Sequence, residues 1–143
     1  MKKFLMVLVL LALCIGMFAC APKKPSIVAK LTIEELGFAS IGEDNKVQMD
    51  VISADTPLFL YVKKIGDFSN PNGEIQPKVS VEIVETQAKR EFFGSVIKTE
   101  GKSMDSSTFP LGALASGTYT VKIIAMDLLA GTEASAQKQL IVP

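Results

Sequence analysis

One stretch of the chain decides the fold: Thr118-Tyr119-Thr120-Val121-Lys122-Ile123-Ile124-Ala125-Met126. Every second position is apolar, so that Tyr119, Val121, Ile123 and Ala125 share one face of an extended chain. Alternation with period two is typical of a β-strand that is buried on one side. We therefore expect a strand here, with these four side chains directed into the core.

The same alternation recurs on both sides of this stretch. Gly, Pro, Asn and Asp residues separate the alternating runs, and helical periodicity is hard to find. Parallel strands need long crossover connections, usually helices, so antiparallel pairing is favoured. The sequence therefore predicts an all-β fold, a seven-stranded antiparallel sandwich after a cleaved N-terminal signal helix. The expected strands are residues 27–38, 47–51, 58–62, 79–83, 92–98, 118–126 and 133–142.

The alternation also predicts which faces of the early strands point inward. In the first strand the apolar positions change phase at Glu34-Glu35, which indicates a bulge or kink between two half-strands. The next two strands each have one apolar face, which we expect to be buried. The residues of these faces are Val47, Met49 and Val51 in the second strand and Leu58, Leu60 and Val62 in the third.

Two polar segments between the strands are candidate partner-binding loops. Residues 66–77 contain two prolines, two glycines and two asparagines, which favours a loop. Residues 99–110 are polar, serine-rich and longer than most connections in a compact domain, so we expect a mobile loop. Long loops on a rigid scaffold often carry function. The side chains that we expect to meet a partner are Asp67, Asn70, Asn72 and Glu74.

The residues before strand 118–126 carry a resemblance to a known fold family. Leu114, the Ser116-Gly117 turn and Tyr119 follow one another closely. This segment resembles the start of the sixth strand in immunoglobulin-like and fibronectin-type-III-like domains, where a Leu, a tight turn and a Tyr form a tyrosine corner. The resemblance implies that the Tyr119 ring packs into the core and that its hydroxyl bonds nearby backbone. It implies a sandwich and no particular activity.

The N-terminus has the pattern of a secretory signal. Met1-Lys2-Lys3 is followed by an uncharged apolar run, residues 4–18, and then by Ala19-Cys20. As a helix this run would be roughly 22 Å long, which is short of the roughly 30 Å hydrocarbon core of a bilayer. A cleaved signal is therefore favoured over a permanent transmembrane helix.

The end of the apolar run resembles the bacterial lipobox, whose invariant Cys receives lipid. Met17-Phe18-Ala19-Cys20 occupies its four places, and the resemblance implies that Cys20 becomes the lipidated first residue of the mature protein. We expect a signal peptide over 1–19, a lipidated tether over 20–26 and one domain over 27–143. A free Cys20 thiol after an ordinary signal peptide is the alternative. Cys14 would be removed with the signal, so no intrachain disulfide is expected.

Composition excludes several kinds of chemistry. The chain has no His, which excludes imidazole catalysis and most zinc or copper sites. Its formal net charge is zero, and no basic stripe suggests nucleic-acid binding. Calcium binding by residues 67–74 is disfavoured, because the acidic positions do not fit an EF-hand register. The nearest approximations to a catalytic carboxylate pair are Glu34-Glu35 and Glu82 with Glu85, whose spacing points them to opposite faces of a strand.

These observations favour a non-enzymatic lipoprotein of the bacterial cell envelope that binds or assembles partners. We expect no cofactor besides the covalent lipid on Cys20, and a protein or polysaccharide of the envelope as partner. By resemblance to sorted lipoproteins, the lack of Asp at position 21 favours the outer membrane in a Gram-negative cell. The alternatives are a carbohydrate-binding domain with an exposed aromatic strand face and a carboxylate-dependent hydrolase. The aromatic residues considered for that face are Phe59, Tyr61, Phe92 and Phe93.

Overall fold

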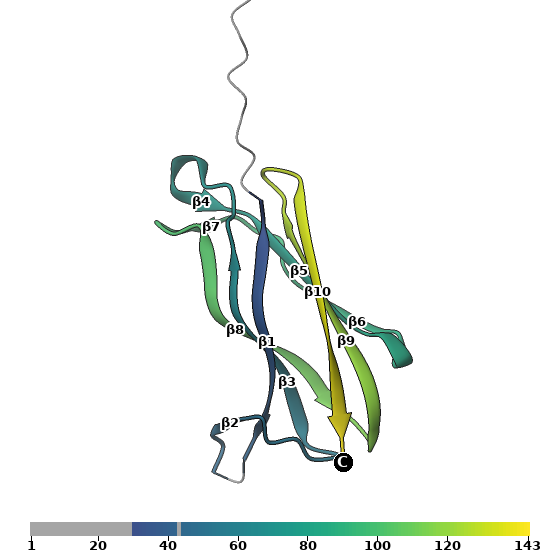
Figure 1. Ribbon diagram of the computed structural model, residues 1–143. Coiled ribbons are helices and arrows are strands. Elements are labelled where there is room, and N and C mark those ends of the chain that lie inside the picture. The colour runs from purple at the N-terminus through teal and green to yellow at the C-terminus, as the bar shows by residue number, and fades with distance from the viewer. Residues whose placement is uncertain (1–29, 43) are drawn as a thin grey trace, which may run out of the picture.

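The computed structural model describes residues 30–42 and 44–143. Its strands form antiparallel sheets, which confirms the prediction of an all-β, antiparallel fold (Figure 1). The expected signal peptide, the whole tether over 20–26 with Cys20, and residues 27–29 of the expected domain lie outside the described residues. The strands are β1 (Thr32–Ile41), β2 (Val47–Met49), β3 (Pro57–Gly66), β4 (Glu74–Ile75), β5 (Pro77–Ile83), β6 (Ala88–Phe93), β7 (Ile97–Lys98), β8 (Ser103–Ala113), β9 (Gly117–Asp127) and β10 (Thr132–Val142). Two single 3₁₀ turns, η1 (Pro71–Gly73) and η2 (Val84–Thr86), complete the elements.

Two four-stranded sheets form the body of the molecule. Their strand orders are β2-β1-β3-β8 and β10-β9-β5-β6, and β4 and β7 form a small separate sheet. In the view of Figure 1, β1 begins at the upper end, which also holds β4, β7 and the turn between β9 and β10. The lower end holds β2 and the C-terminus. The terms upper end and lower end are used in this sense below.

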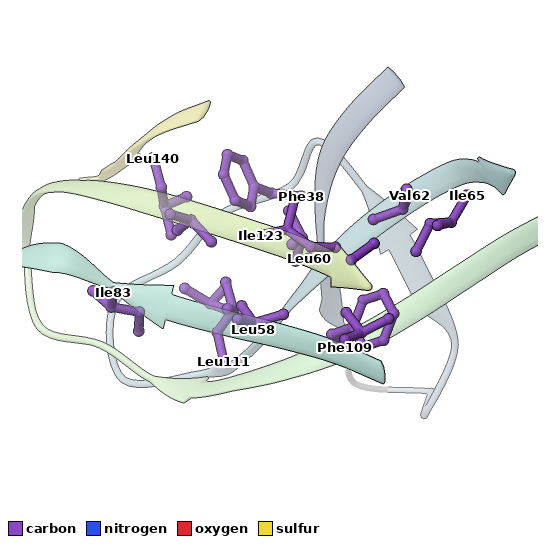
Figure 2. Packing of buried hydrophobic residues seen from close by; sticks show 14 of the residues in the cluster. Phe38, Leu58, Leu60, Val62, Ile65, Ile83, Phe109, Leu111, Ile123 and Leu140 are labelled. Atoms are coloured by element: carbon purple, nitrogen blue, oxygen red, sulfur yellow. The ribbon is translucent and has the colours of Figure 1, made fainter. Parts of the chain in front are cut away.

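Side chains from both sheets fill one hydrophobic core (Figure 2). Leu58, Leu60 and Val62 on β3 are fully buried, as their alternation predicts. On β9 the side chains of Val121, Ile123 and Ala125 are also fully buried, and Tyr119 packs half-buried at the margin. The alternation of apolar residues in these two strands therefore corresponds to burial of one face between the two sheets.

The expected irregularity in the first strand occurs at Glu35. This residue has a φ of +46°, in the left-handed region that non-glycine residues seldom adopt. Leu36 and Phe38 continue the inward face beyond it, whereas Leu31 and Ile33 supply that face before it. One residue in this conformation is enough to change which face the following side chains meet.

The segment expected to be a mobile loop over 99–110 is largely a strand, so that expectation is wrong. Strand β8 pairs with β3 along its length, from Gly66 opposite Ser103 to Pro57 opposite Ala113. Ser106 has a φ of +51°, which changes the phase between the inward residues Met104 and Phe109. That change hides the alternation, and a serine-rich composition is typical of loops.

The burial predicted for the second strand is also wrong. Val47, Met49 and Val51 are 59%, 44% and 48% exposed. Strand β2 is only three residues long and pairs with β1 alone, at the edge of its sheet. Alternation sets one apolar face, but an edge position leaves that face without a covering layer.

The strand expected over 92–98 is divided in the structure. Strand β6 ends at Phe93, and β7 begins at Ile97 in a different sheet. Phe93 and Gly94 have φ values of +66° and +106°, so the backbone turns away from β5 between the two strands. The Phe92 ring is directed inward and lies 5.2 Å from the Phe109 ring, centroid to centroid.

Candidate functional site

The two segments expected to be partner-binding loops meet at the upper end. The Phe68 N–H donates to the Lys102 carbonyl at 2.8 Å, and the Thr99 N–H donates to the Gly73 carbonyl at 3.0 Å. The Phe68 side chain is fully buried in the core. An aromatic anchor beneath the loop and backbone bonds across it define one conformation for both segments.

Asn70 ties the two segments together through its side chain. Its Nδ2 donates to the carbonyls of Thr99 at 3.0 Å and Gly101 at 2.7 Å. The Oδ1 atom of the same side chain is buried and has no hydrogen-bond partner among the described residues. Asn70 was expected to meet a partner, but its amide group is engaged within the fold.

The other three expected partner residues differ in accessibility. Asp67 and Asn72 are exposed, whereas Glu74 is half-buried in β4. Asn72 has a φ of +62°, which Asn tolerates better than most residues. The upper end therefore presents Asp67 and Asn72 on a framework that Asn70 and Phe68 hold in place.

Asp127 is the residue that sequence reasoning missed at this end. It is 1% exposed at the end of β9, and its Oδ2 accepts from the Ser69 N–H at 2.6 Å. Its Oδ1 accepts from the backbone N–H groups of Leu129 at 3.0 Å and Ala130 at 3.2 Å. One carboxylate thus fixes both the loop after β3 and the turn after β9. An Asp before a turn is ordinary turn chemistry, so only the long-range bond to Ser69 distinguishes it.

Three of the four carboxylates considered for catalysis, those of Glu34, Glu35 and Glu85, each contact a different partner. Glu35 Oε1 lies 2.7 Å from Lys63 Nζ, and Glu34 Oε1 lies 3.7 Å from Lys64 Nζ. Glu85 Oε2 accepts from the Thr120 backbone N–H at 2.7 Å. Within 30–42 and 44–143, no group of three or more Cys, Asp or Glu side chains is placed to hold a metal ion.

Two of these contacts shift a pKa. The hydrogen bond from the Thr120 backbone N–H to the ionised carboxylate lowers the pKa of Glu85 below its usual value. The hydrogen bond and charge of Glu35 raise the pKa of the Lys63 ammonium. Both side chains are exposed, so these are surface contacts that solvent weakens.

An aromatic residue lies on the outer face of the sheet that contains β1 and β3. Tyr61 pairs with Gly37 on that face, and both line an open hollow of about 270 Å³. Polar groups share this hollow with the ring. The remaining lining residues are Glu35, Leu36, Met49, Asp50 and Lys138. The hollow combines an aromatic surface with carboxylates and an ammonium group.

The segment before β9 packs against the core at the lower end. The Tyr119 hydroxyl donates to the Ala115 carbonyl at 2.9 Å, four residues earlier, and Leu114 packs against the core. A Cβ at Gly117 would lie 3.4 Å from three atoms of the Tyr119 side chain, which is ordinary van der Waals contact, so the Tyr119 ring packs directly against this turn.

No protein-family model matches the chain, and no curated protein matches its sequence. The described part of the chain contains no helix with the length and apolarity needed to cross a bilayer.

Proposed function

We propose that this protein is a non-enzymatic lipoprotein of the bacterial cell envelope, in which a lipid on Cys20 tethers an immunoglobulin-like binding or assembly module. The observation that carries the proposal is the sequence Met17-Phe18-Ala19-Cys20 after an apolar run of signal length. A single acyl chain binds a membrane only marginally, and two or more anchor a protein stably. The domain would therefore work at a membrane surface.

The arrangement of the strands supports the immunoglobulin-like assignment. In such domains strands A, B and E share one sheet and strands C, F and G share the other. With β1, β3 and β8 as A, B and E, and β5, β9 and β10 as C, F and G, each observed sheet contains one of these sets, and β2 and β6 are additional edge strands. Tyr119 lies at the start of β9, the strand that corresponds to F, and bonds upstream backbone.

The rigid upper end supports binding as the activity. Phe68, Asn70 and Asp127 fix the loops there in one conformation, so a partner would not have to order them. Confinement near one surface raises the effective concentration for partners held at that surface. Weak contacts through exposed groups such as Asp67 and Asn72 can then suffice.

Fatty-acid labelling in cells tests the anchor. We expect the wild-type chain to incorporate a labelled fatty acid and to fractionate with membranes. The Cys20→Ser variant should lose the label and remain unprocessed or mislocalised, whereas Cys14→Ser should behave like wild type. An unlabelled wild-type chain overturns the proposal.

Crosslinking in intact cells tests the binding activity. We expect an envelope protein or polysaccharide to be recovered with the lipidated chain. The Asp67→Ala/Asn72→Ala variant should reduce that recovery without changing the amount of protein in the membrane. Substrate conversion by the purified protein, with no crosslinked partner, would favour an enzyme instead.

The hollow at Tyr61 favours a second candidate function, carbohydrate binding. Sugars stack on aromatic rings and bond carboxylates, and this hollow offers the Tyr61 ring beside Glu35 and Asp50. A glycan array probed with the purified protein tests this candidate. If it is correct, Tyr61→Ala abolishes the signal, and Phe93→Ala, at an exposed aromatic outside the hollow, leaves it unchanged.

A further inference from the structure

The turn between β9 and β10 exposes two large apolar side chains. Leu128 and Leu129 are 43% and 42% exposed, and Ala130 and Gly131 complete the turn. No side chain in these four residues carries a charge. Solvent-exposed leucines at a tip of this kind suggest a surface that is covered in the working protein.

The four backbone N–H groups of this turn already have acceptors within the protein. Leu128 N–H donates to the Gln76 carbonyl at 2.9 Å, and Gly131 N–H donates to the Asp127 carbonyl at 2.8 Å. The N–H groups of Leu129 and Ala130 donate to the Asp127 carboxylate, at 3.0 and 3.2 Å. A backbone donor without a partner is costly in an apolar medium. Because all four donors have partners, the turn can leave water without that penalty.

The turn lies at the end of the molecule where the chain arrives from Cys20. Thr32, at the start of β1, pairs with Gly66, and the loop that follows Gly66 bonds Asp127 through the Ser69 N–H. Figure 1 shows the start of β1 and the tip of the β9–β10 turn at the same end. Ten residues from Cys20 to Lys30 reach at most about 35 Å. A lipid on Cys20 would therefore keep this end near the bilayer.

The charges at this end do not make it a basic surface. Among the described residues, the exposed ionisable side chains of the loops and strand ends there include both signs in equal number: Lys30, Lys98, Lys102, Asp67, Glu100 and Glu133. Attraction to anionic headgroups needs an excess of cationic residues. The leucines instead fit the boundary between headgroups and acyl chains, where apolar side chains insert without a charge requirement.

We propose that Leu128 and Leu129 insert into the surface of the bilayer that carries the lipid anchor, which orients the domain with its upper end toward the membrane. This inference rests on the proposed anchoring at Cys20. It assigns a second contact to the membrane, one that fixes orientation where a flexible tether would leave the domain free to rotate. The lower end, with β2 and the C-terminus, then points away from the bilayer.

The absence of Trp from the chain gives a direct test. Leu129→Trp places a single indole at the tip of the turn, and Leu128→Trp provides a second probe there. Ile141→Trp is the matched control, at a residue 64% exposed next to the C-terminus. Each mature, lipidated protein is reconstituted into phosphatidylcholine vesicles, with and without bromine on the acyl chains. Flotation of the vesicles reports anchoring, and bromine quenching reports insertion.

We expect all three variants to float with the vesicles. Fluorescence of the two turn probes should shift to the blue and be quenched by brominated lipid, and that of Ile141→Trp should do neither. Flotation with both turn probes unquenched, or with the control quenched as strongly, overturns the insertion and leaves the anchor standing. Failure of the wild-type protein to float overturns the anchor, and the insertion with it.

Discussion

At the two ends of the molecule, the structure differs from the sequence-based expectation in opposite ways. At the upper end, segments rich in Asn, Gly, Pro and Ser are fixed by the buried Phe68 ring and the buried Asp127 carboxylate. At the lower end, the cleanly alternating β2 region leaves Val47 and Met49 exposed on an edge strand. A polar loop is thus well anchored, and an apolar strand is poorly covered.

The difference shows that composition indicates whether a segment prefers a loop or a strand. How firmly the segment is held depends instead on the residues that pack against it from elsewhere in the chain. A loop with one buried aromatic residue and one buried carboxylate has many partners that are distant in sequence. A strand with one neighbour has few, whatever its alternation. Substitutions at five positions test this contrast in four experiments, taken from the largest expected effect to the smallest. Each is compared by urea unfolding of a chain that begins at residue 26.

Phe68→Ala should be the most damaging of these substitutions. It removes a fully buried ring from beneath the upper loops and should lower the free energy of unfolding by about 3–5 kcal/mol. The counterpart at the lower end, Met49→Ala, should cost about 0.5 kcal/mol or less because the side chain is 44% exposed. Equal losses at the two positions would refute the contrast between the ends.

Asp127→Ala should follow, with a loss of about 2–3 kcal/mol, because it leaves the N–H groups of Ser69, Leu129 and Ala130 without their acceptor. Hydrogen exchange should also become faster at these three amides than elsewhere. Asp127→Asn keeps one oxygen acceptor and should lose less. If Asp127→Ala unfolds at the wild-type urea midpoint, the carboxylate does not organise the upper end.

Tyr119→Phe tests the lower end, where the hydroxyl donates to the Ala115 carbonyl in an exposed position. Loss of this one bond should cost about 0.5–1 kcal/mol, and Tyr119→Ala should cost several times more because the ring packs against the core. An unchanged urea midpoint for Tyr119→Ala would show that the ring does not stabilise the lower end.

Glu85→Gln should have the smallest effect, and one that depends on pH. The Thr120 N–H lowers the pKa of Glu85 in the folded chain, so the unfolded chain binds the proton first as the pH falls. The stabilisation is therefore complete above the ordinary glutamate pKa of 4.5 and is lost as the pH falls through the lowered value. The difference in urea midpoint between wild type and Glu85→Gln should shrink over that range. A difference that stays constant from neutral pH to below that range would contradict this assignment.

Most of the core could be predicted because alternation and burial coincide where a strand has neighbours on both sides. Leu58, Leu60 and Val62 on β3 lie in such a strand, and so do Val121 and Ile123 on β9. Strand β8 was not predicted, because the backbone conformation of Ser106 interrupts the alternation of inward and outward side chains. For the upper end, the sequence identified the loop that follows Gly66, but it assigned most of β8 to a second loop and missed Asp127, since a bond across 58 residues leaves no local signal.

By itself the sequence determined that the chain is all-β and antiparallel, because period two and the lack of helical connections are local properties. The proposed anchor at Cys20 also depends on the sequence alone, through its resemblance to a lipobox. Only the tertiary structure decided which alternating strand is covered, which polar loop is rigid and which turn exposes its leucines. Those outcomes depend on which strands become neighbours, and neighbouring strands are set by packing between residues that are far apart in the chain.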